Sequence, residues 1–179
     1  MKTNRKLLAA GVSVVVAAAG GGASAAIASG NHPATSHGSS STTVLKVATV
    51  TVQAGSKTVK RSVLVNGSGR AVYILSGDTT TRPKCTSSSC HANWPAVTTS
   101  AKHPAGGKGV SGKVAVWRHN GSNQITISGH PVYTFAGDPG AGKAFGEGVM
   151  SFGGTWTVVS PSGSAVSVSS SKGSSGYAW

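Results

Sequence analysis

Two of the three acidic residues in this sequence belong to a repeated pattern that could perform chemistry. Residues 132–138 read Val-Tyr-Thr-Phe-Ala-Gly-Asp, and sixty residues earlier residues 72–78 read Val-Tyr-Ile-Leu-Ser-Gly-Asp. Two carboxylates at equivalent strand ends, here Asp78 and Asp138, could form the acid and base pair of glycoside hydrolysis. A small hydrolase that acts on wall polymers is therefore one hypothesis for the function.

The same pattern also has a structural interpretation, which we favour. On a strand, Tyr133 and Phe135 point to one face, as do Tyr73 and Leu75 in the first copy. An aspartate just past the strand can accept backbone amides and hold the following loop. A buried Tyr hydroxyl needs a partner, which the aspartate or a loop carbonyl could supply. The second possibility is that the Tyr and Asp side chains of both copies line a binding cleft.

The sequence contains two cysteines, Cys85 and Cys90, and His91 follows the second one directly. Two cysteines in an exported protein usually pair, so we predict a disulfide. Closing a six-residue loop in this way stabilises a fold by about 2 kcal/mol. Covalent haem is the alternative, although haem attachment normally has two residues between the thiols and this sequence has four.

Motifs for metal binding or catalysis are absent from the sequence. The six histidines are dispersed without the H-x-x-x-H or H-E-x-x-H spacing, although His91, His103 and Met150 could meet in loops. Three acids are too few for a site that binds a hard cation with several carboxylates. Neither a G-x-S-x-G nor a phosphate-binding GxxxxGK[ST] motif occurs. We therefore predict no cofactor, no metal and no catalysis, with a redox or metal-handling envelope protein as an alternative.

The start of the chain has the features of an export signal. Lys2, Arg5 and Lys6 precede an apolar run over residues 7–19, and small residues follow. This arrangement is typical of a Sec-type signal peptide, which we place at residues 1–25. A flexible linker rich in Ser, Thr and Gly is expected over 26–43. No cysteine precedes Cys85, so no lipobox is present, and we predict a secreted or envelope-associated protein.

The charge is strongly unbalanced, with 16 Lys and Arg residues against three acids. Removal of the three basic residues in the signal leaves a net charge of about +10. Such a protein is attracted to anionic surfaces, so cell-wall polymers or a membrane surface are the expected partners. The basic residues are mostly single and no pattern of alternating basic and aromatic residues occurs, so we expect no specific binding to nucleic acid.

The remaining residues predict an all-β domain over 44–168, followed by a loose tail over 169–179. Many Val, Thr and Gly residues and the absence of a helical apolar period favour strands joined by tight turns. We expect two diverged antiparallel meanders, with long loops over 79–112 and 139–154. The expected strands are 46–52, 59–65 and 71–75, then 113–118, 124–128 and 132–135, and finally a hairpin of 156–159 with 165–168.

Several motifs in order resemble those of bacterial secreted-repeat proteins, often lipoproteins, with a repeated Tyr-x-(Phe/Trp/Tyr)-x-x-Asp motif. The second copy fits completely, whereas the first has Leu75 at the aromatic position. The resemblance spans roughly 63–163 and rests further on Cys85, Cys90 and Trp94-Pro95, on Gln124 and 129–133, and on 146–149 and 156–159. It implies an envelope protein and says little about activity. Our hypothesis is a non-catalytic interaction module of the cell envelope or extracellular space.

Overall fold

The computed structural model describes residues 41–166 and 168, all of which belong to one unit, Gly38–Trp179. The predicted signal peptide, almost all of the predicted linker and the predicted tail lie outside these residues. The all-β class is confirmed, since strands dominate the described residues. One short helix, α1 (Ser88–Asn93), interrupts the first long loop, which we had expected to lack secondary structure.

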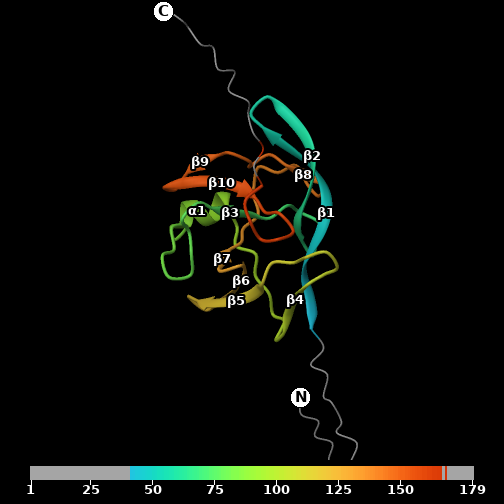
Figure 1. Ribbon diagram of the computed structural model, residues 1–179. Helices are drawn as coiled ribbons and strands as arrows, with labels where there is room; N and C mark the ends of the chain where they lie inside the picture. The colour runs from blue at the N-terminus through green and yellow to red at the C-terminus, as the bar shows by residue number, and fades with distance from the viewer. Residues whose placement is uncertain (1–40, 167, 169–179) are drawn as a thin grey trace, which may run out of the picture. The chain divides into compact units, whose positions relative to one another are not determined.

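The longest strand, β1 (Thr42–Ala54), organises one sheet. It forms an antiparallel hairpin with β2 (Lys57–Asn66), with Ala54 opposite Lys57 and Gly55 at a φ of 59° in the turn. It also pairs in parallel with β4 (Pro104–Gly106) near its start and with β8 (Lys143–Ala144) near its end (Figure 1). These two short parallel pairings were not predicted, and they form because parts of both long loops return to the edge of β1.

A second sheet forms the meander expected for the later half. It contains β5 (Val114–His119), β6 (Ser122–Ile127) and β7 (His130–Pro131) in sequence order. The predicted strand over 132–135 is replaced by isolated bridges from Tyr133 to Tyr73 and to Ala96. The Tyr133 backbone therefore links two separate segments, one from each side.

The third sheet pairs segments that are far apart in the sequence. Its order is β3 (Tyr73–Leu75), β10 (Gly154–Val158) and β9 (Met150–Ser151). We had expected the 156–159 segment to pair mainly with 165–168. That hairpin is reduced to a single bridge between Val159 and Ala165, because β10 takes β3 as its main partner.

The two motif copies meet at the centre of this fold. The Tyr73 amide donates to the Tyr133 carbonyl at 2.8 Å, and the Tyr133 amide returns the bond to the Tyr73 carbonyl at 3.0 Å. The first copy lies in a cycle of three backbone bonds: Leu64 donates to Val159, Val159 to Val72, and Val72 to Leu64.

An equivalent cycle surrounds the second copy. Ile125 donates to Val97, Val97 to Val132, and Val132 to Ile125. The segment that closes each cycle comes from the chain that follows the other copy: Val159 lies just after the second loop, and Val97 lies within the first loop. The repeat is therefore exchanged, because the chain that follows each motif pairs with the other motif.

Aromatic side chains pack together in the core next to the two motif copies. Trp94 stacks on Trp156 with ring centroids 3.9 Å apart, and Phe135 stacks on the Trp94 ring at 4.4 Å. Tyr73 meets Trp94 edge to face, and Tyr133 meets Trp156 in the same way. These aromatics belong to the larger of two hydrophobic clusters, and Trp94 and Trp156 are both fully buried in it.

Candidate functional site

The carboxylate of Asp138, at the end of the second motif, is bound by a tyrosine of the first motif. Tyr73 Oη donates to the carboxylate, at 3.0 Å from Oδ1 and 3.1 Å from Oδ2. The backbone amide of Phe145, seven residues along the loop, donates to Oδ1 at 2.8 Å. Asp138 thus holds its own loop and at the same time binds the opposite copy.

Asp78 makes the matching contacts at the end of the first motif. Tyr133 Oη donates to Asp78 Oδ2 at 2.8 Å, and the Lys84 amide donates to Oδ1 at 2.8 Å. Each tyrosine therefore binds the aspartate of the other copy. Sequence reasoning supplied the residue types for this contact but not the exchange between copies.

Burial shifts the pKa values of the side chains in these Tyr–Asp pairs. Removal from water raises the pKa of Tyr73 and of Tyr133, and the neighbouring carboxylates add to the effect. Burial also raises the pKa of Asp138, while the Phe145 amide, the Tyr73 hydroxyl and the charge of Arg70 each lower it in part. Both tyrosines therefore remain neutral donors at physiological pH.

Glu147, the third acid, was not singled out as a candidate by sequence reasoning. Its carboxylate accepts the Val158 amide at 2.7 Å, and burial raises its pKa. The usable signal was its position: a lone acid between two glycines, in a chain with only three acids. All three acids are buried, with exposed fractions of 0% for Asp78, 5% for Asp138 and 8% for Glu147.

The motif residues consequently form no open cleft in the described part of the chain. Leu75 is buried opposite Trp156, and Phe135 is partly buried against Trp94. Four surface hollows within 41–166 are lined by residues other than Asp78, Asp138 and Glu147. An aspartate pair arranged in this way holds loops and offers no carboxylate to a substrate.

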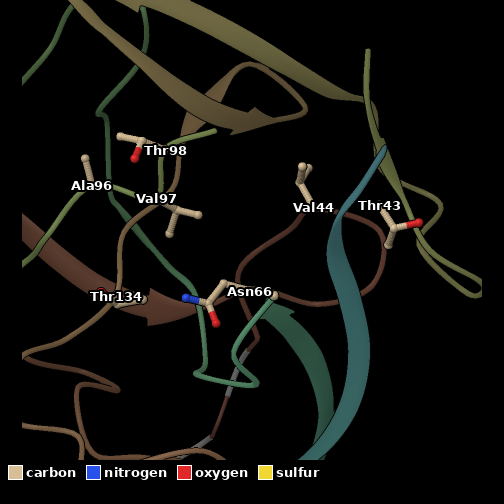
Figure 2. Close-up of a pocket in the computed structure, with 8 residues that line it drawn as sticks. Thr43, Val44, Asn66, Ala96, Val97, Thr98 and Thr134 are labelled. Carbon is tan, nitrogen blue, oxygen red and sulfur yellow. The ribbon is translucent and has the colours of Figure 1, made fainter. Parts of the chain in front are cut away.

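One surface hollow, of about 390 Å³, is lined by segments of both halves. Figure 2 shows the amide nitrogen of Asn66 pointing toward the side where Thr134 lies, with Thr43 and Thr98 on the surrounding segments. No ionisable side chain lines this hollow. It could take a small neutral group by hydrogen bonding, but it has no acid or base for catalysis.

Cys85 and Cys90 form the predicted disulfide, and both are buried. The bond occupies both thiols, so neither is free to attach haem. Among residues 41–166 and 168, no group of three or more His, Cys, Asp or Glu side chains could hold a metal ion. Met150 is 83% exposed, and His91 lines a hollow beside the disulfide.

Comparison with known proteins finds a family model that matches part of this chain. Residues 114–160 match the model of a family described as a secreted repeat of unknown function. No curated protein and no solved structure matches the chain. The match covers β5 to β10 and includes the second motif copy, so the secreted-repeat resemblance is confirmed over this segment. In the part of the chain that is described, no helix is long and apolar enough to cross a membrane.

Proposed function

We propose that this protein is an exported, non-catalytic interaction module that binds anionic polymers of the cell envelope. The observation that carries the proposal is the separation of its charges. Every acidic side chain is buried and holds backbone or tyrosine donors, whereas eleven of the twelve basic side chains within 41–166 are exposed.

The cationic surface is extensive. Eleven Lys and Arg side chains within 41–166 are exposed and Arg70 is partly buried; the exposed ones are Lys46, Lys57, Lys60, Arg61, Arg82, Lys84, Lys102, Lys108, Lys113, Arg118 and Lys143. With no acidic side chain exposed between them, these cations produce a field of one sign over the described surface. Such a surface attracts polyanions and repels other cations.

The hydrogen bonds that the two aspartates accept support a non-catalytic role. Hydrolysis by a carboxylate pair requires both groups to reach the scissile bond. The carboxylate oxygens of Asp78 and Asp138 instead accept hydrogen bonds from Tyr133, Tyr73 and loop amides. A wall-polymer hydrolase would therefore need a different set of catalytic groups.

The proposal is tested by retention of the full chain on isolated bacterial cell walls across a salt series. We expect retention at about 0.01 M salt and release by about 1 M, since the screening length falls from about 30 Å to about 3 Å over that range. A Lys46→Glu/Lys60→Glu variant, changed at two exposed positions of the β1–β2 hairpin, should bind more weakly; Thr49→Ala on β1 is the neutral control. Absence of retention at the lowest salt, or retention unaffected by 1 M salt, would contradict the proposal.

A further inference from the structure

One face of β5 presents an aromatic platform that the fold does not bury completely. Ala115, Trp117 and His119 alternate along the strand and so share a face. Trp117 stacks on His119 with ring centroids 3.6 Å apart, and both side chains are only partly buried. Within the described residues, the Trp117 indole N–H has no hydrogen-bond partner. Trp94 and Trp156, by contrast, are fully buried in the core.

Two hollows beside β5 share Trp117 as a lining residue. One, of about 290 Å³, is lined by Lys113, Ala115 and Thr80 among others. The other, of about 200 Å³, is lined by His119 and by Thr86 of the disulfide loop. We refer to the two hollows together as the β5 groove.

The opposite wall of the β5 groove is the first long loop, which is fixed at several points. The Asp78 carboxylate holds the Lys84 amide, and the Cys85–Cys90 disulfide follows immediately. His130 Nδ1 lies 3.0 Å from the Asp78 carbonyl and ties the loop to the β5 sheet. Figure 1 shows the loop before α1 extending toward the end of β5. Both walls of the groove are therefore preformed.

The groove combines several kinds of group. Trp117 offers a flat apolar face and an indole N–H that has no hydrogen-bond partner among the described residues, Thr80 and Thr86 offer hydroxyls, and Lys113 offers a cation. His91, His119 and Asn120 add imidazole and amide groups. No carboxylate lines either hollow. A flat apolar surface surrounded by hydrogen-bonding groups suits a sugar ring, which has an apolar face and a polar edge, and Lys113 suits an anionic substituent. A groove for single-stranded nucleic acid would instead present aromatics for successive bases.

We propose that the β5 groove binds a sugar unit of an anionic glycan, with Trp117 as the platform and Lys113 as the partner of the anionic group. This inference rests on the proposed function, because it identifies where the polyanion engages specifically. The scattered surface cations attract the polymer, and the β5 groove selects its sugar.

The test measures binding of the full chain to four oligomers of matched length at low salt. An oligogalacturonate supplies sugar and charge, a malto-oligosaccharide supplies sugar alone, a polyphosphate supplies charge alone, and oligothymidylate represents nucleic acid. We expect the oligogalacturonate to bind most tightly and to change the tryptophan fluorescence. Trp117→Ala should weaken that binding about tenfold and Trp117→Phe less, with polyphosphate binding unchanged in both.

A matched pair of lysine variants isolates the groove from the general charge. Lys113→Ala and Lys60→Ala remove the same charge, but only Lys113 lines the groove. We expect Lys113→Ala to weaken oligogalacturonate binding several-fold more than Lys60→Ala. Thermal unfolding of each variant verifies that the fold is intact.

The possible outcomes distinguish binding of a sugar in the β5 groove from the proposed general binding to anionic polymers. Equal binding of polyphosphate and oligogalacturonate, with no effect of Trp117→Ala, would overturn the β5 groove while leaving adhesion to polyanions intact. Tightest binding to oligothymidylate would also overturn it, in favour of a nucleic acid ligand. If none of the three anionic oligomers binds, both proposals are wrong.

Discussion

The two long loops begin with the same contacts and then diverge. Each is held by an aspartate that accepts a loop amide and a tyrosine from the other copy. The first loop then carries the disulfide and α1, and its outer side forms a wall of the β5 groove. The second loop has no disulfide; it approaches the core at Gly146, where a Cβ would lie 2.7 Å from the Trp94 ring, and it exposes Phe145 and Met150. The motif thus serves as the same structural anchor in both halves, and the attached loops differ in what they add: a disulfide and a groove wall in one half, and a backbone packed against Trp94 in the other.

The residue at the aromatic position of the motif also differs between the two copies. Phe135 stacks on Trp94 and closes the core beside the second motif. At the equivalent place, Leu75 lies below Gly154, where a Cβ on the glycine would be 2.7 Å from the leucine Cδ1. The first copy has leucine at this position because the closely approaching β10 backbone leaves no space for a ring.

The largest effect should come from removing either aspartate. Asp138→Ala leaves the Phe145 amide and the Tyr73 hydroxyl without an acceptor, and Asp78→Ala does the same to Lys84 and Tyr133. We expect each change to lower the free energy of unfolding by about 3–5 kcal/mol, measured by urea denaturation. A cost below about 1 kcal/mol at either site would show that the two anchors are not equivalent.

Exchanging the residues at the aromatic position should reveal the asymmetry between the copies. Leu75→Phe places a ring against Gly154 and should lower the free energy of unfolding by about 2–3 kcal/mol. Phe135→Leu removes the stacking on Trp94 and should lower it by about 1 kcal/mol. Thermal and urea unfolding of both variants measure the difference. Equal costs would contradict the argument that the β10 backbone leaves no space for a ring at position 75.

Removing the disulfide should affect only the first loop. Cys85→Ala/Cys90→Ala frees a six-residue loop and should cost about 2 kcal/mol, with lost hydrogen-exchange protection confined to residues near 79–93. The same experiment should leave protection of residues 139–149 unchanged. Loss of protection in both loops would mean that the loops are not independent.

The smallest effect is a dependence of stability on pH. Burial raises the folded-state pKa of Asp138 and of Glu147 above the unfolded values of 3.8 and 4.5. Between the unfolded and folded pKa values the folded state binds more protons, so stability decreases as pH rises from about 4. Asp138→Asn should reduce this slope, as measured by unfolding at a series of pH values. A slope of the opposite sign would show that hydrogen bonds to the carboxylates outweigh their burial.

Local features of the fold were predictable from the sequence. Alternation of Val with polar residues located the β1–β2 hairpin and β5–β6, and two cysteines in an exported chain predicted the disulfide. Helix α1 was missed because six residues are too few to show a helical period. The one cue was Ser87, whose side chain accepts the Cys90 amide as an N-cap.

The exchange between copies could not be predicted. Two identical Tyr and Asp spacings are equally compatible with pairing within a copy and pairing between copies. The pairing of β3 with β10 is decided by burial of Trp156 and Leu75 against each other, and a three-residue strand contains too little pattern to specify a partner about eighty residues away. The β5 groove was missed for a related reason, since its two walls come together only through that tertiary arrangement.

A double-mutant cycle tests whether each tyrosine binds the aspartate of the other copy. The free energy of unfolding is measured for Tyr73→Phe, for Asp138→Asn, for Asp78→Asn and for the two combinations with Tyr73→Phe. We predict a coupling of about 1–3 kcal/mol between Tyr73 and Asp138, and near zero between Tyr73 and Asp78. Coupling of Tyr73 to Asp78 instead, with none to Asp138, would contradict the exchanged repeat.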